Sequence, residues 1–215
     1  VVADVRIAMQ GPYPGGATLN GEPDPLSTTL HADGHIPLSN PYASSTFDGT
    51  LNEYDGTENV PQSFLDSHPT IVDWVVIGLR ETSNGPDVAQ RAVFLRSDAR
   101  LLDLDGSLGV TFSGRTAGDY FIVVYHRNHL PIMTAQTETV TSTASSSLVR
   151  MYRATELFGG TSGAVLLEDA SFDLYGMAAA DGSGDGLVTA PDFNVYSSAS
   201  ASGATGYRAE DYTLD

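Results

Sequence analysis

The chain has 215 residues and is strongly acidic, with 10 Lys and Arg against 27 Asp and Glu and a net charge of −17. This charge argues against a nucleic-acid partner, since the phosphate backbone would be repelled, and it suits divalent cations and an extracellular setting. The absence of cysteine excludes disulfides and thiolate metal sites, and no apolar stretch is long enough for a transmembrane segment.

Short β-strand patterns, separated by Gly, Pro, Asn and Asp, dominate the chain as far as about residue 140. The strongest is the apolar run 71–80, which predicts a central strand with Trp74 in the core. The predicted strands, including a hairpin around Ser97 and Asp98, are residues 4–10, 71–80, 92–96, 99–105, 120–126 and 132–140. They predict an all-β fold, an antiparallel sandwich of immunoglobulin-like or prealbumin-like kind.

Weaker signals lie between and after these strands. Residues 14–61 have little periodicity and predict a loop-rich cover over one end of the sandwich, and brief helices are predicted at 61–66 and 191–197. From Thr137 to Ser147 the chain is rich in Thr and Ser. This composition is typical of either a polar edge strand or an O-glycosylated linker.

Residues 181–192 have the spacing of a calcium-binding loop. Ca²⁺ takes six to eight oxygen ligands, and a twelve-residue loop supplies them from fixed positions around a sharp turn at a glycine, here Gly186. The predicted Ca²⁺ ligands are the side chains of Asp181, Ser183, Asp185 and Asp192 and the backbone carbonyl of Leu187. The alternative is a surface turn rich in Asp and Gly that binds no metal.

The last ligand distinguishes this loop from the usual EF-hand, which ends in Glu. Asp192 at this position resembles the dockerin-type calcium loop of secreted bacterial proteins. After Thr189, the sequence Ala-Pro-Asp predicts a helix start with a hydroxyl cap. A partial second copy offers Asp211, Thr213 and Asp215 as a possible second metal loop, but it lacks the glycine and the closing acid.

Several further segments resemble a β-sandwich module of secreted and surface proteins in environmental bacteria, namely residues 11–13, 35–42, 71–80, 110–114, 118–121 and 125–130. In that family a dockerin-like tail follows the sandwich, here represented by residues 184–188 and 191–194. The resemblance implies an extracellular location and an architecture, but no reaction. We therefore expect a β-sandwich domain at 1–145, a β-rich connecting segment at 146–176 and a dockerin-like calcium-binding region at 177–215.

Candidate catalytic groups are weak. His126 and His129 form an H-x-x-H pattern, but on a strand these positions point to opposite faces, so a zinc pair would require a turn between them and a third ligand. Hydrogen bonds at a strand end are the simpler expectation. His31 and His35 are weaker still, and no nucleophile or phosphate-loop motif is present. We predict that the protein is not an enzyme.

The sequence favours a non-catalytic, calcium-stabilised structural protein of the extracellular surface, which could form fibres. Its partners would be further copies of itself or another surface protein, and the N-terminal run Val1 to Met9 is a candidate strand to donate to a neighbour. The start at Val1 rather than Met suggests a removed signal peptide. Two alternatives remain: an attachment module of a larger secreted protein, and a carbohydrate-binding module with glycans as partners, which would need exposed aromatic side chains or carboxylates facing a cleft.

Overall fold

The computed structural model describes residues 1–15, 25–42, 56–142, 147–168, 173–203 and 206–214. Its largest element is a six-stranded antiparallel sheet in the order β5-β4-β3-β7-β8, in which β9 also pairs with β7. The strands are β3 (Ile71–Arg80), β4 (Asp87–Arg96), β5 (Leu101–Leu102), β7 (Gly118–His126), β8 (His129–Met133) and β9 (Glu138–Val140). The described chain is mostly β-sheet with few helices, which confirms an all-β fold.

Strand β3 lies at the centre of this sheet, as its sequence predicts. Nine of its ten residues are buried, which is the pattern of a strand covered on both faces. The predicted hairpin around Ser97 and Asp98 is also confirmed, since β4 pairs with β5 through Phe94 opposite Leu102. The predicted strand 132–140 is wrong as a single element, because β8 ends at Met133 and β9 begins at Glu138.

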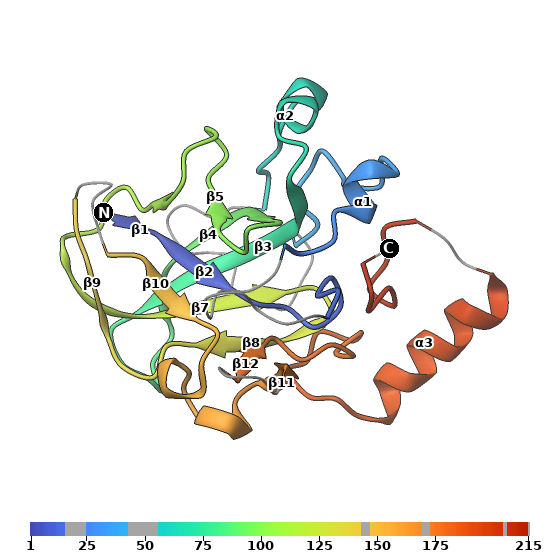
Figure 1. The fold of residues 1–215 in the computed structure, drawn as a ribbon. Coiled ribbons are helices and arrows are strands. Elements are labelled where there is room, and N and C mark those ends of the chain that lie inside the picture. Colours follow the sequence, from blue (N-terminus) through green and yellow to red (C-terminus); the bar gives the residue numbers. More distant parts are fainter. Residues whose placement is uncertain (16–24, 43–55, 143–146, 169–172, 204–205, 215) are drawn as a thin grey trace.

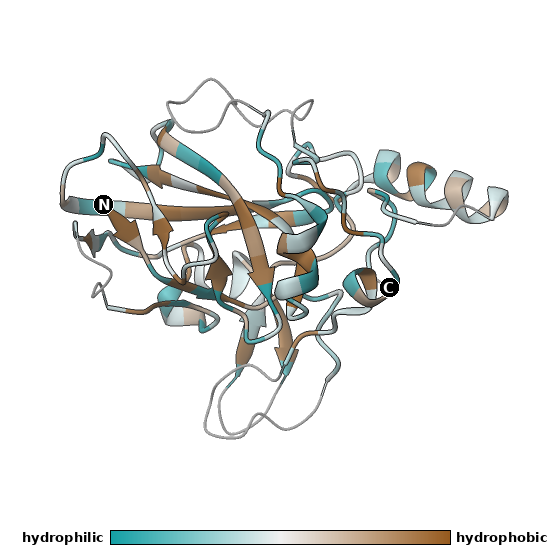
Figure 2. Cartoon of the chain, turned by 90° about the horizontal axis from the view of Figure 1, so that it is seen from above, coloured by the Kyte–Doolittle hydropathy of each residue, from teal (hydrophilic) through white to brown (hydrophobic). Residues whose placement is uncertain are grey.

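Three short strand pairs accompany the main sheet (Figure 1). They are β1 (Val2–Ala3) with β6 (Val110–Thr111), β2 (Val5–Ile7) with β10 (Val149–Met151), and β11 (Val165–Glu168) with β12 (Leu174–Gly176). The β2–β10 pair is parallel, which an all-antiparallel expectation misses. One hydrophobic core joins side chains of these pairs to those of the main sheet, and the apolar residues gather on the strands of the body (Figure 2).

The N-terminal run is part of this core. Val5, Ile7 and Met9 are fully buried, β1 and β2 have partners within the chain, and the amide of Ile7 donates to the carbonyl of Ala99 at 2.9 Å. The prediction that Val1 to Met9 is available as a donor strand is therefore wrong, because its backbone groups and apolar side chains are used within its own fold.

The described parts of the 14–61 cover pack on the end of β3. Helix α1 (Thr29–Ala32) contributes the buried Leu30, and α2 (Gln62–Ser67) follows the cover. The hydroxyl of Tyr42 donates to the carbonyl of Trp74 at 2.7 Å, and the indole of Trp74 donates to the carbonyl of Pro37 at 2.9 Å. Trp74 is fully buried, which confirms it as a core residue whose polar atom is satisfied.

The Thr- and Ser-rich segment forms an edge strand in its first part. Glu138, Thr139 and Val140 pair with β7, so the edge-strand interpretation is confirmed for β9, and residues 143–146 lie outside the described chain. Helix α3 (Ala190–Ser202) extends away from the sheet (Figure 1) and is longer than predicted. Within the described residues, no helix is long and apolar enough to cross a membrane.

Gly78 on β3 makes room for a buried carboxylate. A Cβ added at Gly78 would come 2.3 Å from Oδ2 of Asp87. That carboxylate accepts hydrogen bonds from Gln90 at 2.6 Å and from the hydroxyl of Tyr125 at 2.9 Å, and it pairs with Arg80. The space beside Gly78 is therefore filled by a polar group that cannot move without breaking these contacts.

We expect Gly78→Ala to lower the free energy of unfolding by about 1–3 kcal/mol, the usual cost of inserting atoms into a packed interior. Urea denaturation measures the change. Gly118→Ala is the matched control, because it lies on β7 and its added Cβ would meet no atom closer than 3.6 Å. Equal effects of the two substitutions would contradict the steric explanation.

Candidate functional site

The twelve-residue loop 181–192 is organised around the carboxylate of Asp181. Its Oδ1 accepts the amides of Gly184 at 2.9 Å and Asp185 at 3.1 Å, and its Oδ2 accepts the amide of Gly186 at 3.0 Å. Gly184 and Gly186 have positive φ angles of 71° and 81°, which glycine adopts without strain. The sharp turn predicted at Gly186 is thus present.

Asp192 closes the loop. Its Oδ1 accepts the amide of Ser183 at 2.9 Å, and its Oδ2 accepts the amide of Thr189 at 2.6 Å. Thr189 caps α3 and Pro191 lies in the first turn, which confirms the predicted helix start. These amide donors lower the pKa of Asp192 to about 2, so the carboxylate is ionised at neutral pH.

The first and last positions of the loop therefore carry two buried carboxylates. Asp181 is 2% exposed and Asp192 is 1% exposed. Burial raises the pKa of Asp181, and the charge of Asp192 raises it further, while the three amide donors oppose that rise. The loop thus contains negative charge that is not balanced by a basic side chain, because no ion pair with either carboxylate occurs in the described chain.

The other predicted ligands are not gathered around one point with Asp181 and Asp192. Oδ1 of Asp185 accepts the amide of Leu187 at 2.9 Å, and the Leu187 side chain is 62% exposed. Across the described ranges, no three His, Asp or Glu side chains surround a common point. The structure brings Asp181 and Asp192 into one hydrogen-bonded loop and leaves Asp185 turned to its own backbone. The donor set consists of oxygens alone, which suits a hard cation such as Ca²⁺.

The loop is attached to the turn between β7 and β8. The amides of Ala180 and Asp181 both donate to the carbonyl of Asn128 at 3.1 Å, and the amide of Leu130 donates to the carbonyl of Ala178 at 2.8 Å. The residues just before the loop therefore continue the hydrogen bonding of the main sheet. A change in the conformation of the loop would therefore act first on the hydrogen bonds to the carbonyl of Asn128.

Beneath this turn lies a buried polar group, the Asp73 cluster, made of Asp73, His126, Arg127, His129 and Tyr207. Oδ2 of Asp73 lies 3.0 Å from Nε2 of His126 and 3.1 Å from Arg127, and Oδ1 accepts the hydroxyl of Tyr207 at 2.7 Å. Despite its complete burial, Asp73 has a lowered pKa, because Arg127 and His126 oppose the desolvation. The sequence pattern predicts no role for Asp73, although an acid inside the apolar run 71–80 is a signal of a buried polar contact.

The two imidazoles of the cluster form a chain with defined proton positions. Nε2 of His129 accepts the amide of Gly11 at 3.3 Å, so the proton of a neutral His129 lies on Nδ1. This atom is 2.7 Å from Oδ1 of Asn128 and 3.0 Å from Nδ1 of His126. His126 then donates from Nε2 to Asp73. The expectation of opposite faces is wrong for this pair, because the strand ends and the chain turns at Arg127 and Asn128. The expected strand-end hydrogen bonds are present.

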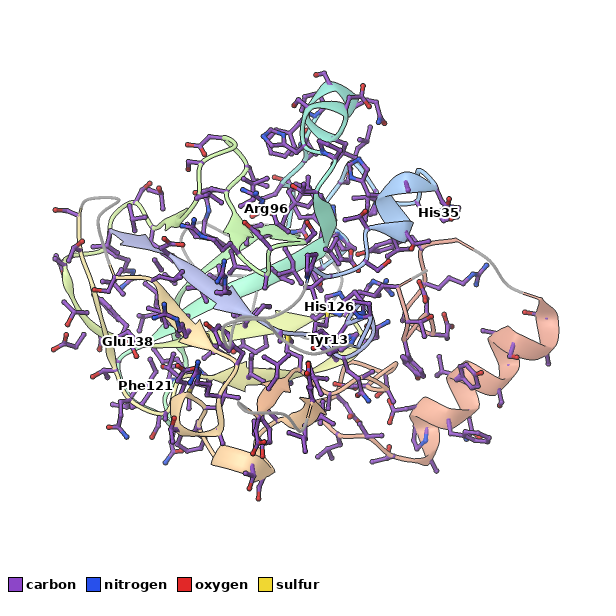
Figure 3. The ribbon with its side chains drawn as sticks, in the orientation of Figure 1. Tyr13, His35, Arg96, Phe121, His126 and Glu138 are labelled. Atoms are coloured by element: carbon purple, nitrogen blue, oxygen red, sulfur yellow. The ribbon has the colours of Figure 1, made fainter. Side chains whose placement is uncertain are left out.

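The remaining histidines lie elsewhere. His126 lies inside the body, whereas His35 lies near α1 and is exposed (Figure 3). The structure therefore does not unite His31 or His35 with the Asp73 cluster, and it provides no third ligand beside His126 and His129 within the described residues.

The partial second loop packs against the body. Oδ1 of Asp211 accepts the amide of Leu214 at 2.8 Å and the hydroxyl of Thr213 at 3.3 Å, and Nδ2 of Asn128 donates to the carbonyl of Asp211 at 2.6 Å. Leu214 is 1% exposed, and the third candidate ligand, Asp215, lies outside the described chain. Asp211 and Thr213 thus form a local turn held by Asn128, the same residue that holds the first loop.

Acid should destabilise the Asp73 cluster. Burial lowers the pKa of His126, and lowers that of His129 well below its ordinary 6.5. As the pH falls below 6.5, the unfolded chain binds protons that the folded chain does not, so the free energy of unfolding decreases. We expect the melting temperature, measured by calorimetry, to fall from pH 6.5 to about pH 5, above the range in which most carboxylates titrate.

His129→Gln should make this decline shallower, because it removes the imidazole with the larger pKa shift. A melting temperature that stays constant over the same pH range in the parent chain would contradict the assignment of two neutral, buried histidines.

Comparison of the chain with protein-family models, with curated proteins and with solved structures found no match in any of the three.

Proposed function

We propose that this protein is a non-catalytic, calcium-stabilised structural protein of the extracellular surface, and that loop 181–192 binds the ion. The observation that carries the proposal is the pair of buried carboxylates, Asp181 and Asp192, at the two ends of one loop with oxygen donors between them. A divalent cation would balance their charge. Because Asn128 joins the loop to the main sheet, the ion would also stabilise the body of the protein.

The proposed calcium ligands are those of the sequence pattern. Asp181, Ser183, Asp185 and Asp192 would supply side-chain oxygens, and Leu187 would supply its carbonyl. Asp185 would rotate from the amide of Leu187 toward the ion. The bound ion would contribute charge neutralisation and a fixed loop geometry, with no step of chemistry assigned to it.

A structural role is supported by the placement of the most reactive side chains. Asp73, His126 and His129 are at most 2% exposed, and they are hydrogen-bonded to one another. A general acid or base has to reach a proton of the substrate. These three groups join β3, the β7–β8 turn and the C-terminal segment, and the small pocket that His126 and His129 border is shared with Asp181 and Asp185 of the loop.

We also propose a sandwich architecture of immunoglobulin-like or prealbumin-like kind. The six-stranded sheet would be one layer, and the short pairs β1–β6, β2–β10 and β11–β12 would form an interrupted second layer. The support is the single core that their side chains share.

An attachment module of a larger secreted protein is the second candidate. The observation in its favour is a group of exposed apolar side chains on the loop and the first turns of α3, namely Leu187 (62%), Val188 (52%), Phe193 (66%) and Tyr196 (45%). Apolar side chains gathered in this way often mark a protein-binding surface.

Negative-stain electron microscopy of the purified chain, with Ca²⁺ and after chelation, separates these functions. Filaments that loosen on chelation would support the calcium-stabilised structural subunit. Dispersed monomers in both conditions would favour the attachment module. Calorimetric titration with Ca²⁺ on the same sample tests the metal site itself, and the absence of binding would overturn the calcium part of both proposals.

A further inference from the structure

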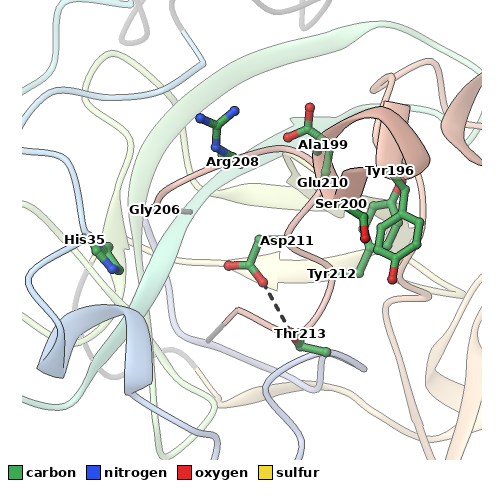
Figure 4. A pocket seen from close by; sticks show the side chains of 10 residues that line it. All are labelled: His35, Tyr196, Ala199, Ser200, Gly206, Arg208, Glu210, Asp211, Tyr212 and Thr213. Atoms are coloured by element: carbon green, nitrogen blue, oxygen red, sulfur yellow. Dashed lines mark hydrogen bonds between the residues drawn. The ribbon is translucent and has the colours of Figure 1, made fainter. Parts of the chain in front are cut away.

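A groove of about 650 Å³ lies between α3 and the C-terminal segment 206–213 (Figure 4). This volume lies within the range of roughly 300–1,000 Å³ that is typical of small-ligand sites. Its lining comes from three parts of the chain: the exposed loop at His35, the middle of α3, and the segment from Gly206 to Thr213. The groove is distinct from loop 181–192, none of whose five proposed ligands lines it, although Asp211 and Thr213 of the partial second loop do.

One wall of the groove is aromatic. The rings of Tyr196 and Tyr212 stack with centroids 5.8 Å apart and planes at 21°, and Tyr196 is 45% exposed. Tyr212 is held in place because its hydroxyl donates to the carbonyl of Asp192 at 3.2 Å. Its hydroxyl also lies close to Gly182, where an added Cβ would come within 2.5 Å of it. The wall is therefore a supported aromatic surface that faces solvent.

The other walls carry hydrogen-bonding groups of both kinds. In the described chain, no residue forms a side-chain hydrogen bond with Glu210, His35 or Ser200, although all three line the groove. Glu210 accepts, Ser200 donates and accepts, and His35 does either according to its tautomer. Arg208 adds a donor to the same lining.

We propose that this groove binds a neutral oligosaccharide. A sugar ring has an apolar C–H face that packs on an aromatic ring, and hydroxyls at its rim that both donate and accept hydrogen bonds. The groove presents the matching pair of features: the Tyr196–Tyr212 wall, and a mixed lining that includes Glu210 and Ser200. The inference goes beyond the proposed structural role, because it assigns a ligand to a surface that calcium binding does not use.

The negative charge of the chain favours a neutral ligand over an anionic one. The net charge of −17 and the carboxylate of Glu210 disfavour sulfated or uronic sugars. The lining contains two carboxylates, Glu210 and Asp211, and one guanidinium, Arg208, so it does not consist of acceptors alone, as a site for a cationic ligand would. A polyhydroxylated, uncharged molecule suits a lining that both donates and accepts hydrogen bonds.

The test is saturation-transfer NMR, followed by calorimetric titration, of the full chain with cellotetraose, xylotetraose, mannotetraose and chitotriose as probes. We expect at least one of these to bind. Tyr196→Ala should weaken binding by about tenfold or more, as expected of a central aromatic contact. Glu210→Gln, which keeps the shape of the side chain, should weaken it by about tenfold through the loss of a charged hydrogen bond.

Phe193→Ala is the matched control, because Phe193 is an exposed aromatic on the same helix that does not line the groove. It should leave binding unchanged. The proposal is overturned if none of the probes binds, if binding survives in both groove variants, or if a cationic probe such as spermidine binds the groove and the oligosaccharides do not.

Discussion

Asp73→Ala should lower the free energy of unfolding by about 3–5 kcal/mol, because it removes one member of a buried ion pair and leaves Arg127 with only the more distant carboxylate of Asp211, at 4.0 Å. The Arg127 side chain is 8% exposed and that of Asp73 is fully buried, so water cannot replace the lost carboxylate. His126 and the hydroxyl of Tyr207 lose their acceptor in the same change. Urea denaturation followed by circular dichroism measures the loss.

Four further variants identify the origin of this effect. Asp66→Ala removes a carboxylate from the exposed face of α2, where, among the described residues, it accepts a hydrogen bond from Gln62, and it should change stability by less than about 0.5 kcal/mol. Asp73→Asn keeps the shape of the side chain but not its charge, and should remain strongly destabilised. Adding Arg127→Gln to Asp73→Asn should cost less than the sum of the single changes, because the two charges compensate each other.

Asp73→Ala should also release the C-terminal segment from the body of the protein. Tyr207 is anchored by its hydrogen bond to Asp73 and by its ring, which lies 4.2 Å below the guanidinium of Arg127. We expect faster tryptic cleavage after the neighbouring, exposed Arg208 in Asp73→Ala than in the parent chain. Parent-like stability together with parent-like cleavage would show that the cluster does not hold this segment.

Local patterns were enough to predict several elements. The apolar run 71–80 became the central strand, the Ser97–Asp98 turn became a hairpin, and the cap at Thr189 began a helix. Each of these depends on residues close together in sequence, where the side-chain period and the turn chemistry act directly.

Long-range partners could not be predicted in this way. The parallel pairing of β2 with β10 joins residues about 140 positions apart, and no local pattern specifies such a partner. The N-terminal run has the alternation of an edge strand that could join a neighbour, but its burial depends on where β10 and β6 lie. The same limit applies to Asp73, whose partners Arg127 and Tyr207 come from distant segments.

Loop 181–192 was predictable in its local geometry but not in its attachment to the body. The spacing of Asp181, Gly186 and Asp192 is local, and the structure contains the turn and the closing contact that it predicts. The attachment of the loop to Asn128 is not local, and it changes the expected consequence of binding. An ion in a tethered appendage would order only that appendage, whereas an ion here would also stabilise the β7–β8 turn.

Removal of Ca²⁺ should therefore lower the stability of the whole chain. A site with a Kd of about 10⁻⁴–10⁻³ M, as in extracellular modules, would stabilise the folded state by about 2.7 kcal/mol at a hundred times the Kd. We expect chelation to lower the melting temperature of the parent chain, and hydrogen exchange at Asn128 and Leu130 to increase with it. Differential scanning calorimetry and exchange mass spectrometry measure the two effects.

The double variant Asp181→Asn, Asp192→Asn should lose this response. Its melting temperature should be the same with Ca²⁺ and with chelator, because both end carboxylates are needed to hold the ion. Each Asn keeps only one acceptor oxygen, so the backbone hydrogen bonds to the second oxygen of Asp181 and of Asp192 are lost, and this loss lowers the melting temperature equally in both conditions. Asp98→Asn, which removes a carboxylate from the distant β4–β5 turn, should respond to Ca²⁺ as the parent does. If chelation does not change the melting temperature of the parent chain, the buried carboxylates shape a turn and bind no structural ion.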